Sequence, residues 1–91
     1  MLVALIARDK PGATEIRAEN RPAHLDYLKT TASQVAQAGP LLDPDGTMIG
    51  SLIILDVADL SGAQAWADAD PYALAELFSS VELIEWKRVI G

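Results

Sequence analysis

The 91-residue chain has no cysteine and only one histidine, His24. The absence of cysteine excludes disulfide bonds, thiolate metal ligands and cysteine nucleophiles. A single imidazole also excludes a metal site built from several histidines of one chain. We therefore expect no resident metal. The lack of cysteine fits a cytoplasmic protein, which is the location we predict.

Long apolar runs and clusters of basic residues are absent as well. The apolar run at residues 2–7 has six residues, whereas a membrane-spanning helix needs about 18. No basic segment precedes this run, so we expect no signal peptide. The chain has 7 basic and 13 acidic residues and a net charge of −6, which argues against nucleic acid as a partner. We expect neither a membrane nor a nucleic acid to be its partner.

The chain is instead rich in apolar residues, which make up 51% of the sequence. Its length predicts a single domain over residues 1–91. A domain of this size buries only about 60–65% of its unfolded surface. Part of the apolar surface therefore remains available for a partner subunit.

Residue spacing predicts a strand followed by a long helical segment. Residues 2–8 are aliphatic and nearly continuous, which is typical of a strand buried on both faces. From 13 to 38 the apolar spacing becomes helical. Because proline breaks a helix interior, we expect a break near Asn20 and Arg21, with Pro22 in the first turn of the main helix. One helix face then carries His24, Leu28, Thr31 and Val35, and Gly39-Pro40 ends the helix.

The second half of the chain predicts a hairpin, a helix and a final strand. The Asp-Pro-Asp-Gly segment at 43–46 is typical of a turn between two strands. Ser61 and Gln64 have the spacing of a capping box, and Asp70-Pro71 is typical of a further helix start. In order, the predicted elements are a strand beginning at 40–42, a strand at 49–57, a helix at 61–69, a helical turn within 72–77 and an edge strand at 80–90.

The resulting order β-α-β-β-α-β is that of an α+β, ferredoxin-like fold. In this fold both helices cover one face of a four-stranded antiparallel sheet, and the other face has no cover of its own. We expect the open face to carry Val3, Leu5, Leu52 and Ile54, or the residues that alternate with them. Leaving such residues in water costs about 25 cal/mol per Å². We therefore predict a homodimer in which two open sheet faces pack together.

Five segments of the chain carry a resemblance to a known family. They are RPAHLDYL at 21–28, AGPLLD at 38–43, GSLIIL at 50–55, AQAWADADPY at 63–72 and the final WKRVIG. In this order and spacing the chain resembles the YciI-like (YCII-related) family. The resemblance implies ferredoxin-like domains that dimerise into an α+β barrel, and a family in which one enzyme removes chloride from an aromatic compound.

The chain also departs from the pattern of the family that it resembles. Glu76 stands where the family commonly has glycine, and Glu85-Trp86 replaces a common Pro-aromatic pair. We expect Glu76 to narrow or charge the mouth of the pocket that the resemblance implies.

His24 and Asp70 are the candidate catalytic residues. His24 is the side chain best able to exchange protons near neutral pH, although a histidine at the edge of the core is the alternative interpretation. Asp70 precedes a proline and is by itself typical of a helix N-cap. The resemblance implies that the two residues form an active site. One carboxylate can serve both purposes, because one oxygen can cap the helix while the other accepts the imidazole N–H.

The resemblance also places Arg21, Ser51 and Tyr72 in the same cavity, as candidate substrate-binding residues. Arg21 can bind a carboxylate or phenolate, or pair with a surface acid such as Asp26. Ser51 can hydrogen-bond a ligand or simply pack in its strand. Tyr72 can form a pocket wall or remain a half-buried surface aromatic.

These residues predict a small cofactor-independent enzyme. His24, oriented by Asp70, would move a proton on a small cyclic or aromatic acid, in an elimination such as dehydrochlorination, an isomerisation or a hydrolysis. The chain has no glycine-rich dinucleotide fingerprint, and we expect no cofactor. The main alternative is a dimeric binding or sensing module that holds a small-molecule ligand without turnover. A purely structural dimer is the third.

Overall fold

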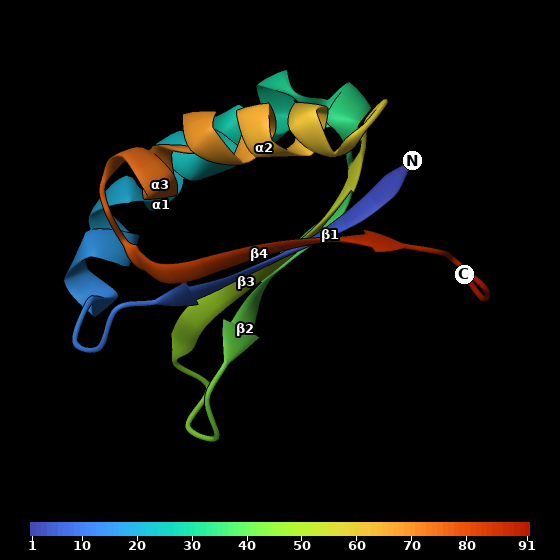
Figure 1. Cartoon of the computed structure of the whole chain (residues 1–91). Helices are drawn as coiled ribbons and strands as arrows, with labels where there is room; N and C mark the ends of the chain where they lie inside the picture. Colours follow the sequence, from blue (N-terminus) through green and yellow to red (C-terminus); the bar gives the residue numbers. More distant parts are fainter.

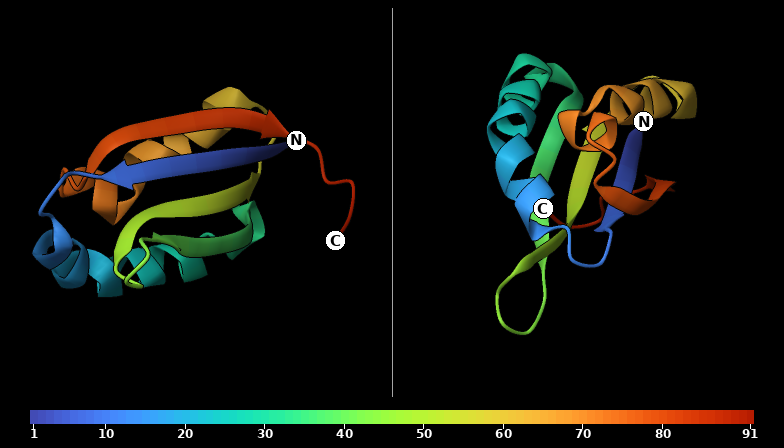
Figure 2. Two further views of the ribbon diagram at one scale, coloured as in Figure 1. Left: turned by 90° about the horizontal axis from the view of Figure 1, so that it is seen from below. Right: turned by 90° about the vertical axis from the view of Figure 1, so that its left-hand side faces the viewer.

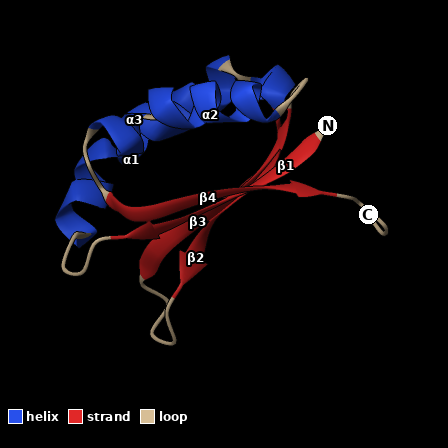
Figure 3. Ribbon diagram, in the orientation of Figure 1, coloured by secondary structure: helices blue, strands red, loops and turns tan.

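A four-stranded antiparallel sheet forms one layer of the structure, and three helices form the other (Figures 1 and 3). The computed structural model describes all residues, 1–91. The strand order is β2-β3-β1-β4, which confirms the predicted ferredoxin-like fold with its helices on one face. The elements are β1 (Leu2–Asp9), α1 (Thr14–Thr30), a 3₁₀ turn (Ala32–Gln34), β2 (Val35–Leu42), β3 (Met48–Asp56), α2 (Leu60–Ala69), α3 (Pro71–Leu74) and β4 (Phe78–Trp86).

The hydrophobic core lies between the two central strands and α2. Val3, Leu5 and Ala7 alternate along β1 and face the helices, as Ile53 and Leu55 do on β3. Leu5 lies opposite Ile53 and Val3 opposite Leu55, so the two strands present one continuous apolar surface. The residues of α2 that cover this surface are Ala63, Trp66 and Ala67.

The opposite face of the sheet has no covering element (Figure 2, left). It carries Leu52, Ile54 and Ile84, which alternate with core positions on β3 and β4. Leu52 is 41% exposed and Ile84 is 50% exposed. The expectation that Val3 and Leu5 share this face with Leu52 is wrong, because both pair with core residues of β3 and therefore point to the helices.

Helix α1 is one continuous helix, so the predicted break before Pro22 is wrong. A proline in a helix interior removes one backbone hydrogen bond and costs about 3 kcal/mol. The unbroken helix holds its two buried residues, Arg17 and His24, about two turns apart on one face. Hydrogen bonds from these two side chains to Asp9 and Asp70 hold the helix on both sides of the proline.

The helical segment is also shorter than predicted, and residues 35–42 form the edge strand β2. The hydroxyl of Thr31 closes the helix end, because it donates to the Tyr27 carbonyl oxygen at 2.6 Å and accepts from Trp66 Nε1 at 2.9 Å. The residues that follow pair with β3. Gly39-Pro40 therefore lies within a strand, where proline is tolerated at a sheet edge.

Smaller differences concern caps and strand ends. Asp59, rather than the predicted Ser61, caps α2, because its carboxylate accepts a hydrogen bond from the Gly62 N–H at 2.8 Å. The predicted turn at 43–46 is confirmed. The final strand is an edge strand as predicted, but it spans 78–86 instead of 80–90.

Glu76 follows α3 with a φ of 58°, the one positive φ in the chain outside glycine. This left-handed conformation costs a residue with a Cβ about 1–2 kcal/mol, whereas glycine adopts it freely. The Glu76 side chain is exposed, so its removal leaves no buried gap.

Replacement of Glu76 by glycine is expected to raise the free energy of unfolding by about 0.5–1 kcal/mol. Relief of the backbone strain exceeds the extra entropy that glycine gives the unfolded chain. Urea denaturation measures the change. Glu76→Ala keeps the Cβ and is the matched control, expected within about 0.5 kcal/mol of the parent protein; equal stability of the two variants would contradict the strain.

Candidate active site

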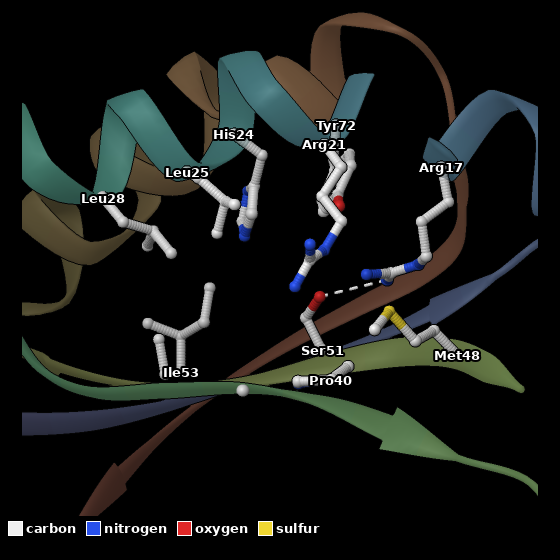
Figure 4. A pocket seen from close by; sticks show the side chains of 12 residues that line it. Arg17, Arg21, His24, Leu25, Leu28, Pro40, Met48, Ser51, Ile53 and Tyr72 are labelled. Atoms are coloured by element: carbon white, nitrogen blue, oxygen red, sulfur yellow. Dashed lines mark hydrogen bonds between the residues drawn. The ribbon is translucent and has the colours of Figure 1, made fainter. Parts of the chain in front are cut away.

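A cavity of about 140 Å³ lies between α1 and the β2–β3 side of the sheet (Figure 4). A cavity of about 150 Å³ accommodates benzene, so this one suits a single six-membered ring. Leu25, Leu28 and Ile53 lie toward one end of the cavity, and Arg17, Arg21 and Ser51 lie toward the other, the polar end, with Pro40 and Met48 beneath them (Figure 4). The polar residues are Arg17, Arg21, His24, Ser51 and Tyr72, and the apolar ones include Leu25, Leu28, Pro40, Met48 and Ile53.

His24 on α1 and Asp70 at the start of α3 form a buried pair. The distance between His24 Nδ1 and Asp70 Oδ1 is 2.8 Å, and the two residues are 6% and 1% exposed. The same oxygen, Oδ1, also accepts the backbone N–H of Tyr72 at 3.0 Å and so caps α3. The expectation that each carboxylate oxygen serves one purpose is therefore wrong, and Asp70 Oδ2 is buried without a partner in the chain.

The contact with Asp70 determines which ring nitrogen of His24 carries the proton. An ionised carboxylate only accepts hydrogen bonds, so the geometry assigns the proton to Nδ1. In the neutral imidazole Nε2 is then the acceptor. The ring extends from α1 toward the cavity (Figure 4), so this nitrogen is available to take a proton from a bound molecule.

Tyr72 supports the His24 ring from the side. The two rings stack with centroids 4.0 Å apart and planes 17° apart, and the Arg17 guanidinium lies 4.6 Å from the centroid of Tyr72. Tyr72 is 1% exposed, so it is not the half-buried surface aromatic of the alternative interpretation. Burial raises its pKa, while the charges of Arg17 and Arg21 oppose that shift. Its hydroxyl is buried without a hydrogen-bond partner in the chain.

Arg17 and Asp9 are site residues that sequence reasoning missed. Asp9 Oδ2 accepts from Arg17 Nε at 2.7 Å, Asp9 Oδ1 accepts from an η nitrogen at 2.9 Å, and the same nitrogen donates to Ser51 Oγ at 3.1 Å. Burial alone would lower the pKa of Arg17, but the hydrogen bonds and charge of Asp9 outweigh it, so the pKa is raised. The spacing of Arg17, Arg21 and His24 on one helix face could have revealed the arginine.

The structure brings the five sequence-predicted residues together. Arg21, His24, Ser51 and Tyr72 line the cavity, and Asp70 lies behind His24. Arg21 reaches the cavity between His24 and Ser51 (Figure 4) and has no carboxylate partner in the chain, so the alternative pairing with Asp26 is not formed. Their roles remain predictions at this point.

Three further observations concern the other expectations from the sequence: the effect of Glu76, a metal site and a membrane span. Glu76 is not among the residues that line the cavity, so its expected effect on the pocket mouth is not seen in the single chain. No three carboxylate or imidazole side chains lie close enough together to hold a metal ion. No helix combines the length and the apolar character that crossing a membrane requires.

Fold and sequence together identify the class of protein. The family model of the YCII-related domain matches residues 1–87, and the chain belongs to this family. It is 36% identical to the protein YciI of Escherichia coli O6:H1 (strain CFT073) over an alignment of 97 positions. The alignment covers 98% of this chain and 99% of the relative.

Two solved structures resemble this chain to different extents in sequence and in fold. One is 5-chloro-2-hydroxyhydroquinone dehydrochlorinase from Burkholderia phenoliruptrix AC1100 in complex with 2,5-dihydroxybenzoquinone. It is 29% identical, with a TM-score of 0.88 over 96% of this chain and 94% of that one. The other, PA3566 from Pseudomonas aeruginosa, is 13% identical, with a TM-score of 0.60 over 98% of this chain and 93% of that one, and shares the fold alone.

Both tyrosines of the chain, Tyr27 and Tyr72, have a raised pKa, chiefly because of burial. We expect the tyrosinate absorbance of the folded protein to rise only above pH 10, the ordinary value being about 10. Because the folded pKa is the higher one, this contribution to stability is present below about pH 10 and is lost as the pH rises through the folded values.

An alkaline absorbance titration in buffer and in denaturant tests this expectation. Tyr27→Phe and Tyr72→Phe assign the two steps, since each variant retains one tyrosine. A folded protein that titrates at the same pH as the denatured chain would show that neither hydroxyl is shielded.

Proposed function

We propose that this chain is a small cofactor-independent enzyme that moves protons on a small cyclic or aromatic acid. His24 is the acid–base residue, and Asp70 is the carboxylate that orients it. The buried 2.8 Å contact between them, at the wall of a ring-sized cavity, is the observation that carries the proposal. The full-length likeness to a dehydrochlorinase supports it.

Proton transfer would use the nitrogen of His24 that Asp70 leaves free. Nε2 takes a proton from the bound acid, and the resulting imidazolium is stabilised by the carboxylate of Asp70. Stacking on Tyr72 keeps the ring from turning away. The burial of all three residues excludes water, which strengthens their electrostatic interactions.

The acid would bind with its oxygen atoms toward the polar end of the cavity. Arg21 has no carboxylate partner in the chain, so its guanidinium is free to donate two parallel hydrogen bonds to a carboxylate, or to donate to a phenolate oxygen. Ser51 and Tyr72 present hydroxyl groups to the same region. Leu25 and Leu28 would contact the apolar edge of the ring.

Dehydrochlorination of a chlorinated hydroxyquinol illustrates how one such base suffices. His24 would first transfer a proton from a ring hydroxyl to the neighbouring carbon that bears chlorine, which gives a ketone. It would then take the proton of the hydroxyl para to that ketone while the C–Cl bond breaks and chloride leaves with the bonding pair. The products are a hydroxyquinone and HCl, so atoms and electrons balance without an oxidant.

Asp70→Asn is expected to lower kcat by about 10²- to 10⁴-fold, because asparagine no longer provides the charge that holds the imidazolium. The free energy of unfolding should change by less than about 1 kcal/mol, since asparagine also caps helices well. Chloride release from 5-chloro-2-hydroxyhydroquinone measures the activity. Asp59→Asn, at the cap of α2 and outside the cavity, is the control and should retain full activity.

Loss of activity in proportion to loss of fold would leave Asp70 with the capping role alone. Binding of 2,5-dihydroxybenzoquinone without turnover of any ring acid would instead identify a binding or sensing module. Activity, stability and quinone binding can all be measured on the same protein preparations.

We also propose that the chain forms a homodimer through its open sheet face. Leu52 and Ile84 leave large apolar side chains in water on that face, at about 25 cal/mol per Å². Packing two such faces together removes this surface from water, as sheet-on-sheet packing does within domains.

Leu52→Glu is expected to convert the homodimer into a monomer, because it places a charge in the apolar centre of the interface. Light scattering distinguishes the 9.7 kDa monomer from twice that mass. Leu74→Glu on α3 is the control, since Leu74 is exposed on the helix layer. A parent protein that is monomeric at high concentration would contradict the proposal.

A further inference from the structure

The polar end of the cavity is lined mainly by hydrogen-bond donors, since its two hydroxyl groups can donate as well as accept and neutral His24 is the one side chain there that presents only an acceptor. Arg17 and Arg21 can only donate. The hydroxyl of Tyr72 has no partner in the chain, and Ser51 donates to no atom of the chain. A ligand that satisfies this end must therefore bring acceptor oxygens.

Among these polar groups, the Ser51 hydroxyl has its orientation determined by a neighbouring side chain. It is 2% exposed, and its Oγ accepts a hydrogen bond from Arg17 at 3.1 Å. A guanidinium cannot accept a bond in return, so the single hydroxyl proton must point elsewhere. In Figure 4 the Ser51 oxygen faces the cavity beside Arg17 and Arg21.

Asp9 holds Arg17 in the position that this arrangement needs. Its two oxygens accept from two nitrogens of the guanidinium, in the bidentate geometry that fixes both the plane and the rotation of the group. Both side chains are more than nine-tenths buried. One nitrogen is shared between Asp9 and Ser51, so the carboxylate, the guanidinium and the hydroxyl form one chain that ends at the cavity.

We propose that Arg17, held by Asp9, is a positioning residue that fixes Ser51 as a hydrogen-bond donor to a carbonyl or phenolate oxygen of the bound ring. This inference rests on the proposed function only in that the cavity binds a small cyclic acid. A hydrogen bond from a cation to Oγ also polarises the hydroxyl and strengthens its donation. The ligand class is therefore a single ring with a negatively charged or carbonyl oxygen at the Ser51 end.

The competing interpretation is that the ion pair only ties the end of β1 to α1. A merely structural pair changes stability when it is broken, but it leaves the affinity of the folded protein for a ring oxyanion unchanged. The two interpretations therefore differ in ligand binding rather than in unfolding.

The test measures the dissociation constant of 2,5-dihydroxybenzoquinone by calorimetry. Ser51→Ala should bind it about 10- to 100-fold more weakly, the usual effect of one hydrogen bond to a charged group. Arg17→Lys keeps the charge but cannot contact Asp9 and Ser51 with the same rigid fork, so a similar loss is expected. The double variant should bind within about twofold of Ser51→Ala, because both changes remove one interaction. Arg8→Lys, exposed and outside the cavity, is the matched control.

Infrared spectra of the bound quinone give a second readout. A hydrogen bond lowers the C=O stretching frequency, so Ser51→Ala and Arg17→Lys should both shift it upward by the same amount. If Arg17→Lys does not fold, Ser51→Ala alone tests whether Ser51 donates a hydrogen bond to the ring oxygen.

The outcomes separate this inference from the proposed function. Unchanged affinity of Ser51→Ala, effects that multiply in the double variant, or failure of the parent protein to bind the quinone would overturn it. Binding with the expected pattern but without turnover would support it and contradict the enzymatic proposal alone.

Discussion

One carboxylate oxygen, Asp70 Oδ1, joins the two parts of the molecule on which the cavity depends. It accepts the imidazole N–H of His24 from α1 and the backbone N–H of Tyr72 from α3. The same atom therefore caps a helix and orients the His24 ring. Because Tyr72 follows two residues later, the cap also brings its ring against the imidazole. The cap of α3 and the orientation of the His24 ring therefore depend on the same carboxylate oxygen.

The charges along α1 show a simple order. Arg17 and His24 are buried, and each has a carboxylate partner from another element, Asp9 for the first and Asp70 for the second. Arg21, which lies between them in sequence, has none. Buried charges are tolerated when they are paired, and Arg21 is the one of these three side chains that lines the cavity without a carboxylate partner.

Alternating and helical residue patterns were sufficient to predict the fold, because they report which faces are buried. They failed where a distant partner decides the structure. Val35 and the residues after it have helical spacing, yet they form β2 because β3 offers a pairing edge. Helix α1 continues through Pro22, and buried contacts with other elements hold the helix on both sides of it. Such long-range contacts are invisible to a local pattern.

Only part of the candidate site could be predicted from the sequence. The family motifs identified His24 and Asp70 because both lie in recognisable segments. Arg17 and Asp9 belong to no such segment. An Asp before a Lys-Pro-Gly turn and an Arg on a helix are ordinary surface residues in a sequence. Only the fold shows that the end of β1 and the second turn of α1 meet, and that their ion pair is buried. Burial, rather than residue type, distinguishes this pair from a surface salt bridge.

The shortness of α3 has a consequence for the dynamics of the site. It is a single turn of four residues, too short to be stable by its own hydrogen bonds, so it depends on its cap and on the packing of Tyr72. Opening this turn would withdraw the Asp70 carboxylate and the Tyr72 ring in the same event, because Asp70 caps the turn and Tyr72 belongs to it. In the proposed enzyme, His24 would then be held in position only in molecules in which the turn is closed. Amide hydrogen exchange at Tyr72 reports that population.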